Sequence, residues 1–295
     1  MSSQDTFGGS GSNGPEIDDT EPGFYNYVDE REQIRRRKEI ANQNPPWTAD
    51  EILQQYHFCN IDRRHDRGTR FYLEHVAPPS QTAFTDETEV AEDLFIRTVV
   101  YRLLNHPDSY REIEDLIDGR DTDLVAIVAT LEDREERVFS SAYRVGGNNT
   151  TDYNGKLEQL FYGGLRDDLM PRFDELCEGT MYADTLEQAN QPLRDVTGFG
   201  EFLVYEIATD LNYIWFDFHE DDFVNVGPGA EKGLEQIYGD DISDYEAKLR
   251  DLQSKQDESL PEDFPYLTAR DVEHSLCEYA KYLRVKNGGK TRRYL

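Results

Sequence analysis

The sequence predicts an all-α, multi-helical fold, and two observations support this. From Phe24 onward, apolar residues recur at the three- and four-residue spacing of amphipathic helices, whereas the alternating pattern of strands is almost absent. The segments between these stretches are short and rich in Gly, Pro and Asn, which is typical of connections between helices. Extended backbone is conceivable only in Trp215–Phe218 and at Val224.

Thirteen helical segments are predicted in chain order, each from its apolar periodicity and some with a recognisable start, such as Thr48 as an N-cap. Their ranges are 27–38, 48–58, 62–76, 87–104, 109–117, 123–137, 156–168, 170–177, 185–190, 201–213, 230–238, 243–256 and 268–286. No internal repeat is visible. Residues 1–22 consist of Gly, Ser, Asp and Glu with almost nothing apolar, so we expect a disordered tail. Residues 23–295 then form one helical domain, which its length allows to divide into two lobes with a cleft.

The chain is strongly acidic, with 61 acidic and 31 basic residues among 295 and a formal charge of −30. The acidic residues are spread along the whole chain, which favours a hydrated surface over an acidic binding tail. Arg outnumbers Lys by 23 to 8. This composition is expected of a halophilic protein, from an archaeal cell or its virus. A mesophilic DNA mimic is the alternative, but it would not need clustered arginines.

Several classes of protein are disfavoured. No apolar run approaches the length of a membrane span and no signal peptide is present, so we expect a cytoplasmic protein without a membrane partner. The cysteines Cys59, Cys177 and Cys277 lie far apart with no CxxC pair, so we expect neither a metal site nor a disulfide framework. No cofactor is predicted. Gly289-Lys290-Thr291 resembles part of a Walker loop but lacks the upstream glycine, so a nucleotide kinase is not predicted in this sequence.

The most informative local pattern is Gly198-Phe199-Gly200 between two predicted helices, which indicates a helix-hairpin-helix. In that motif the glycines let backbone N–H groups at the start of the second helix approach a DNA phosphate. An ordinary turn with glycine caps is the alternative.

The hairpin resembles that of helix-hairpin-helix DNA glycosylases, in which a catalytic Asp follows further along the chain. The corresponding positions here are Glu220, Asp221 and Asp222. Asp222 is the candidate, because it precedes a turn that would aim its carboxylate into a cleft, where it could stabilise positive charge on a sugar or a benzylic carbon. A solvated surface Asp is the alternative. Phe202 stands where the bifunctional enzymes have Lys, so lyase chemistry is disfavoured.

Gly227-Pro228-Gly229, followed by Lys232, is a glycine-rich loop that opens a helix. It predicts either a phosphate cradle at the helix N-terminus or a tight turn made rigid by proline.

Basic residues gather in three segments, which we expect to contact DNA unless they pair with nearby carboxylates. The segments are Arg31 with Arg35–Lys38, then Arg63, Arg64, Arg67 and Arg70, then residues 281–293, which include Lys281 and Arg284.

Four blocks together resemble the helical domain found with 5-hydroxymethyluracil DNA kinases and the related glutamyl or putrescinyl thymine pyrophosphorylase group. They are Pro45 to Arg70 (PPWTADEILQQYHFCNIDRRHDRGTR), the hairpin with Asp210-Leu, the GPGA-x-x-GL loop, and Asp271 to Tyr282 (DVEHSLCEYAKY). The likeness runs from about Phe24 to Leu295. It departs from the family pattern at Cys59, where Thr is common, and at Asp62, where a bulkier residue is common.

The resemblance implies a DNA-glycosylase-like helical fold that serves DNA hypermodification. In such systems hydroxymethyluracil in DNA is phosphorylated, and an amine or amino acid then displaces the activated group. The candidates for reading a flipped base or binding its phosphate are Asn60, Arg63, Asp66, Arg67 and Arg70. A buried salt-bridged brace is the alternative for these residues. The face formed by Glu273, Cys277, Glu278 and Lys281 is expected to be a core Cys flanked by ion pairs.

Three functions therefore remain. The leading one is a DNA-base-modifying protein that displaces an activated group on an extruded thymine-type base. The second is a monofunctional DNA glycosylase. The third is a non-catalytic DNA-binding module that partners a separate P-loop 5-hydroxymethyluracil DNA kinase.

Overall fold

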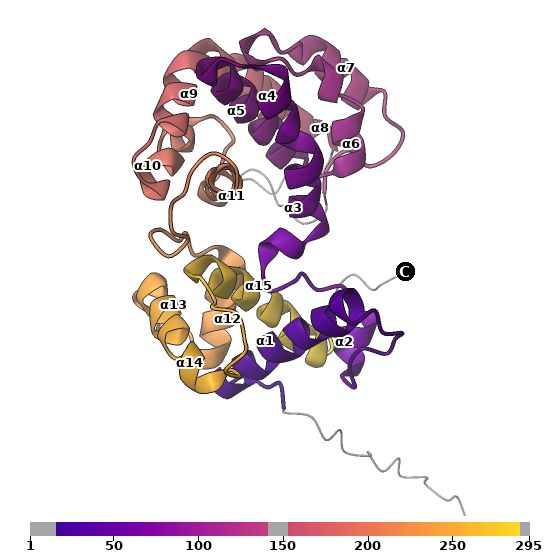
Figure 1. Ribbon diagram of the computed structural model, residues 1–295, viewed down its shortest axis with the longest axis vertical. Coiled ribbons are helices and arrows are strands. Elements are labelled where there is room, and N and C mark those ends of the chain that lie inside the picture. The colour runs from indigo at the N-terminus through magenta and orange to yellow at the C-terminus, as the bar shows by residue number, and fades with distance from the viewer. Residues whose placement is uncertain (1–15, 141–152, 290–295) are drawn as a thin grey trace, which may run out of the picture. The chain divides into compact units, whose positions relative to one another are not determined.

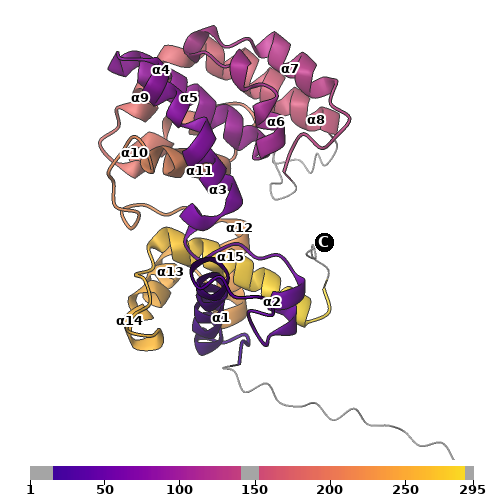
Figure 2. The ribbon, with the colours of Figure 1, turned by 45° about the vertical axis from the view of Figure 1, so that its right-hand side comes forward.

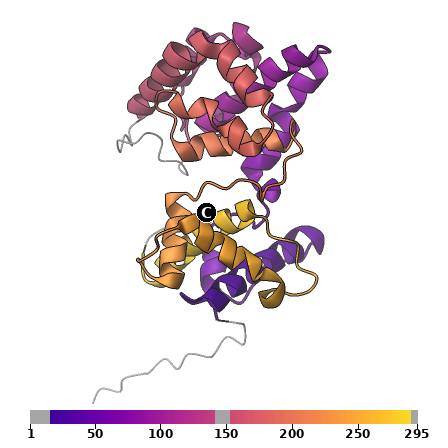
Figure 3. The same cartoon turned by 90° about the vertical axis from the view of Figure 1, so that its left-hand side faces the viewer.

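Helices and the loops that join them make up the described structure, a computed structural model covering residues 16–140 and 153–289. No strand occurs within these two ranges, and Figure 1 and Figure 3 show coiled ribbons and loops. The all-α prediction is therefore confirmed. Trp215–Phe218 and Val224, where extended backbone was conceivable, lie in a loop without strand pairing.

The chain divides into two compact units. Among the described residues, the terminal unit consists of residues 16–63 and 226–289, and the central unit consists of residues 64–140 and 153–225. The terminal unit contains α1 (Glu21–Arg35), η1 (Arg36–Ile40), α2 (Glu51–Gln55), α12 (Pro228–Tyr238), α13 (Tyr245–Ser254), α14 (Gln256–Ser259) and α15 (Ala269–Lys286). The short η2 (Arg63–His65) includes the boundary.

The central unit contains the remaining described helices. They are α3 (Arg67–Phe71), η3 (Tyr72–Val76), α4 (Pro78–Ala83), α5 (Glu87–Leu104), α6 (Pro107–Arg111), η4 (Glu114–Leu116), η5 (Gly119–Asp121), α7 (Leu124–Glu132), α8 (Tyr153–Leu157), η6 (Glu158–Leu169), η7 (Met170–Arg172), α9 (Phe173–Met181), α10 (Leu186–Asn190), η8 (Pro192–Asp195) and α11 (Glu201–Asn212).

In the terminal unit, α15 is the helix on which the others pack. A capping box starts it, because the Thr268 hydroxyl accepts a hydrogen bond from Asp271 N–H and the Asp271 carboxylate accepts one from Thr268 N–H. α12 lies beside α15 (Figure 1, Figure 2), and a Cβ atom on Gly233 would come within 2.5 Å of the Leu276 carbonyl oxygen. Glycine is therefore required for this close packing. The core is completed by aromatic rings: Phe24, Tyr27, Phe58, Tyr279 and Tyr282.

In the central unit, α5 is the helix against which several others pack, as α15 is in the terminal unit. Asp86 caps its start and Asn105, in the left-handed conformation, ends it. Most of its residues are buried, and they pack against α4, α9, α11 and η3.

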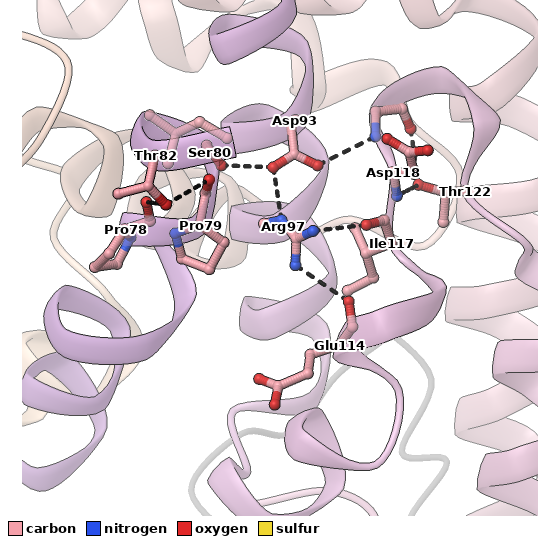
Figure 4. A network of polar contacts seen from close by, with 12 residues as sticks. Pro78, Pro79, Ser80, Thr82, Asp93, Arg97, Glu114, Ile117, Asp118 and Thr122 are labelled. Carbon is pink, nitrogen blue, oxygen red and sulfur yellow. Dashed lines mark hydrogen bonds and ion pairs between the residues drawn. The ribbon is translucent and has the colours of Figure 1, made fainter. Parts of the chain in front are cut away.

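A buried network around Asp93 holds several segments of the central unit together (Figure 4). The Asp93 carboxylate accepts hydrogen bonds from Ser80 Oγ at 2.8 Å, Arg97 Nε at 2.6 Å and Gly119 N at 3.2 Å. Arg97 also donates to the Ile117 carbonyl oxygen at 2.7 Å. Both charged groups are therefore bound within the unit, and the network braces α4, α5 and the turns at η4 and η5.

The long predicted helices match best. The segment 87–104 has the bounds of α5, and 268–286 and 201–213 differ from α15 and α11 by one residue. The segments 48–58 and 123–137 are shorter in the structure, and 62–76 is divided into η2, α3 and η3. Among the described residues, no helix is both long and apolar enough to cross a bilayer.

The predicted tail ends too late. Residues 16–20 pack on the terminal unit: Ile17 is buried, and the Asp18 carbonyl oxygen accepts a hydrogen bond from Tyr279 Oη. α1 begins at Glu21 because the Thr20 side chain caps it and Pro22 suits its first turn. Composition alone missed this, because a single buried Ile and a cap are enough to fix a short segment. Residues 1–15 lie outside the described residues.

Candidate functional site

Polar side chains gather on one side of α15, within the terminal unit. Glu273, His274, Cys277, Glu278 and Lys281 follow one another at helical spacing and share a face. Glu273 and Glu278 are buried, and the other three are half-buried. These five residues, together with Arg31, Cys59 and Arg63 from the first segment of the unit, are called the α15 polar cluster below.

Glu278 fixes the loop that carries Cys59. Its carboxylate accepts a hydrogen bond from Cys59 N–H at 2.9 Å and pairs with Lys281 Nζ at 3.1 Å. The Lys281 ammonium also lies 4.8 Å from the centre of the Phe58 ring, a cation–π contact. From α1, the buried Arg31 donates to the carbonyl oxygens of Phe58 and Cys59, each at 3.1 Å. Two buried charged side chains therefore hold the backbone of one loop and position its side chains.

Arg63 and His274 are neighbours within the cluster. Arg63 Nη1 lies 3.4 Å from Nδ1 and 3.5 Å from Nε2 of His274. A ring nitrogen of His274 lies within 4.8 Å of Cys59 Sγ. Burial, followed by two nearby carboxylates, raises the pKa of the Cys277 thiol to about 12, so this thiol stays protonated at neutral pH. The cluster thus gathers two guanidinium groups, an imidazole, an ammonium, two half-buried thiols and two buried carboxylates.

The glycine-rich loop before α12 packs closely on α15. Gly227 N–H donates to the buried Glu273 carboxylate at 3.1 Å. Gly229 packs against Cys277 so closely that a Cβ atom would collide with its sulfur. Lys232 is exposed. A carboxylate at this helix N-terminus favours the alternative interpretation, a tight turn. The phosphate loop formed by Gly227, Gly229 and Lys232 stays a prediction.

The predicted hairpin lies in the central unit, between η8 and α11. Gly198 has a φ of +81°, which favours glycine, and Gly200 immediately precedes α11. The Asp168 carboxylate of η6 accepts hydrogen bonds from the Thr197 N–H and hydroxyl, both at 2.7 Å. Phe199 is buried, whereas Gly200 is exposed. The turn is therefore fixed and presents backbone to solvent, although the segment before it is a four-residue 3₁₀-helix rather than a full α-helix.

Asp222, the predicted catalytic carboxylate, is exposed in the loop after α11. The buried carboxylates of α11 are Glu206 and Asp210, and both pair with the buried Arg102 of α5, Glu206 at 3.1 Å. The sequence contained a signal for this triad. A charged residue interrupts the apolar end of the segment 87–104, and two carboxylates lie four residues apart on the later apolar segment 201–213. The catalytic role of Asp222 stays a prediction.

The candidate base-reading residues divide between the units. Asn60 and Arg63 belong to the terminal unit, whereas Asp66, Arg67 and Arg70 belong to the central unit. Arg67 and Arg70 are exposed on α3, and Arg70 lies 3.9 Å from Glu74. The function of these five residues as a set stays a prediction.

Many side chains of the basic segments pair with nearby carboxylates of the protein, which was the alternative to contact with DNA. Arg35 and Arg36 pair with Glu32, and Arg37 pairs with Glu30 at 3.1 Å. Lys281 pairs with Glu278, whereas Arg284 is exposed. Residues 290–293 lie outside the described residues.

A family model for "5-hmdU DNA kinase, helical domain" matches residues 20–291. The chain belongs to this family. Among curated proteins, the chain is similar to a "5-hmdU DNA kinase" of Bacillus phage SP10, with 29% identity over 290 residues. The match covers 88% of this chain and 44% of the phage protein, so the chain spans less than half of that relative. No solved structure matches.

Within this helical domain of the 5-hmdU DNA kinase family, most of the distinctive sequence lies in one unit. The segment 45–63, the GPGA loop and the segment 271–282 all belong to the terminal unit, and all three contribute to the contacts of the α15 polar cluster. The hairpin belongs to the central unit. The terminal unit therefore holds the candidate chemical site, and the central unit holds the candidate DNA-binding turn.

Proposed function

We propose that this domain acts in the modification of 5-hydroxymethyluracil in DNA. Its substrate would be an extruded base whose hydroxymethyl group carries a phosphate, and the reaction would displace that activated group by an amine. The membership of the 5-hmdU DNA kinase family and the likeness to the phage kinase support this substrate class.

The observation that carries the chemical part is the α15 polar cluster. A phosphate leaving group gains negative charge as its bond to carbon breaks, and a fixed guanidinium and imidazole such as Arg63 and His274 stabilise such charge. Glu278 and Arg31 hold the neighbouring loop in place, so these groups need little rearrangement. An incoming amine must lose a proton, and His274 is the group in this cluster suited to accept it.

The hairpin would hold the DNA. The N-terminus of α11 favours anions, and the exposed Gly200 leaves room for a phosphate to approach its backbone. The acidic composition fits a halophilic setting, in which molar salt shortens the Debye length to ~3 Å and weakens repulsion between the protein and DNA.

A second function is favoured by the position of Asp222. This carboxylate is exposed and the buried carboxylates of α11 are bound to Arg102, so the central unit fits a non-catalytic DNA-holding module better than a glycosylase. In that role the domain would present DNA to a 5-hydroxymethyluracil kinase on a separate chain.

The deciding experiment compares nucleosides from DNA made with and without the gene, measured by mass spectrometry. Loss of a modified thymidine without the gene supports the proposal, and unchanged nucleosides would refute it. Purified protein is then incubated with phosphorylated 5-hydroxymethyluracil DNA and an amine in high salt. Product formation indicates a transferase, release of free base indicates a glycosylase, and DNA binding without either product indicates the holding module.

A further inference from the structure

An open groove of about 520 Å³ lies on the terminal unit, away from the residues of the α15 polar cluster. It is lined by η1 with the end of α1 and by the loop before α15. Its lining consists of Glu32, Arg35, Arg36, Arg37, Ile40, Ala41, Asp263 and Pro265. Three of the charged side chains are basic and two are acidic, in a chain whose formal charge is −30. Basic side chains thus outnumber acidic ones by one in the lining, and Arg37 also pairs with Glu30, which lies outside it.

Arg36 has all its donor nitrogens directed to carboxylate or carbonyl oxygens. Its Nε lies 3.0 Å from Glu32, which is buried and also held by Arg35. Its outer nitrogens reach Asp263: Nη1 lies 2.6 Å from Oδ2 and Nη2 lies 2.9 Å from the carbonyl oxygen. The inner partner is thus fixed in the fold, and the outer partner lies on a loop.

Asp263 is a weak partner for Arg36. Its side chain is 74% exposed, whereas that of Arg36 is 26% exposed. An ion pair with so exposed a carboxylate contributes little to stability. A DNA phosphate offers two oxygens to the same fork and gains from the release of counterions when it binds. Exchange of Asp263 for a phosphate would therefore cost little.

We infer that this groove is a contact for the DNA backbone, in which a phosphate replaces the Asp263 carboxylate on Arg36. The groove also has an apolar edge suited to sugars and bases. Ile40 is 68% exposed on it, and Tyr266, next to Pro265, is 58% exposed. Asp263 competes with a DNA phosphate for Arg36, and it therefore weakens the binding of DNA to the groove. The inference rests on the proposed function, since it needs DNA as the partner.

The test measures binding of the full chain to a fluorescent duplex across a series of salt concentrations. Arg36→Gln should weaken binding and reduce the slope of log affinity against log salt by about 0.9, the contribution of one phosphate. Asp263→Asn should tighten binding by about 1.4- to fivefold, the range of an exposed ion pair. In the Arg36→Gln background, Asp263→Asn should change nothing, because the competition has been removed.

Two matched variants control for charge alone. Glu262→Gln removes the neighbouring exposed carboxylate, which does not line the groove. Arg250→Gln removes an arginine of similar exposure, 30%, that pairs with Glu246 on α13. Neither should change the salt slope. Thermal unfolding of each variant shows whether it folds. If Arg36→Gln does not fold, the binding affinity of Asp263→Asn still tests the inference.

The outcomes separate the two proposals. If the unchanged protein does not bind DNA at all, the proposed function fails. If it binds but Arg36→Gln and Asp263→Asn both keep the original slope and affinity, or if Glu262→Gln tightens binding equally, the groove inference is overturned and these arginines serve the fold or a protein partner.

Discussion

One group of buried charges in each unit differs from the other in its partners. In the central unit, Arg102 pairs with Glu206 and Asp210, so side chains of α5 and α11 satisfy one another. In the terminal unit, Glu273 and Glu278 accept hydrogen bonds from backbone N–H groups of loops. The first arrangement joins two helices and leaves no group for a ligand. The second arrangement fixes loops whose side chains remain half-buried and can contact a ligand. The comparison indicates a scaffold in the central unit and a supported chemical site in the terminal unit.

Removal of Arg102 should have the largest effect on stability. Arg102→Leu leaves two carboxylates buried without their cation, which typically costs about 3–5 kcal/mol. Denaturation by guanidinium chloride, followed by circular dichroism, measures the loss. Arg120→Leu is the matched control, because that arginine pairs with Glu92 and Asp174 at the surface and its loss should cost far less stability. Equal losses in the two variants would contradict the scaffold interpretation.

Gly233→Ala should destabilise the terminal unit next. Its Cβ would lie 2.5 Å from the Leu276 carbonyl oxygen, so α12 must move away from α15, at a typical cost of about 1–3 kcal/mol. Gly200→Ala is the control, since no atom lies within 4 Å of its Cβ and its φ of −90° suits alanine. Its melting temperature should be close to that of the unchanged protein. A stable Gly233→Ala protein would show that α12 does not pack as described.

Substitutions of Glu278 test whether its carboxylate stabilises the loop that carries Cys59. Glu278→Ala leaves Cys59 N–H without this acceptor and should cost about 1–2 kcal/mol. Glu278→Gln keeps a carbonyl oxygen for the same N–H and should recover most of the stability. Hydrogen exchange of the Cys59 amide reports the contact directly. If Gln restores neither stability nor protection, the charge matters more than the hydrogen bond.

The smallest effect concerns Asp168 at the hairpin. Its pKa is lowered below the usual value of 3.8, mainly by the hydrogen bond from the Thr197 hydroxyl, with further contributions from the Thr197 N–H and Arg172. A lowered pKa in the folded state stabilises the protein above the unfolded-state pKa, and this contribution is lost as the pH falls through the folded-state value.

Asp168→Asn should therefore reduce stability at neutral pH and flatten its dependence on pH below about 4. Acid titration followed by circular dichroism measures this. DNA binding should also weaken if the hairpin holds DNA, because the neutral carbonyl oxygen of Asn accepts the hydrogen bonds from Thr197 more weakly than the carboxylate does. A variant with an unchanged acid transition would show that Asp168 does not fix the turn.

The helices were predictable where local signals are strong. α5 and α15 have long apolar periodicity and capping residues at their starts, and the predicted ends agree within a residue. The segment 62–76 was not predictable in detail. Its periodicity indicates a helix, but the chain there changes from one unit to the other and the helix is divided.

Part of the candidate site was also visible in the sequence. The residues of α15 share a face by spacing alone, and the expected ion pair between Glu278 and Lys281 is present. The loop partners of the carboxylates were not predictable, because Cys59 and Glu278 are separated by 219 residues. No local pattern encodes such a contact.

The sequence by itself determined the helical class, the principal helices and the family, because periodicity, caps and ordered motifs are properties of neighbouring residues. Only the tertiary structure decided which charges are buried and what they bind. It showed that Gly229 of the GPGA loop packs against Cys277 of α15 and that the Glu273 carboxylate accepts a hydrogen bond from Gly227 of the same loop. The physical reason is that burial and pairing depend on segments brought together from distant parts of the chain, and these set the cost of each charge.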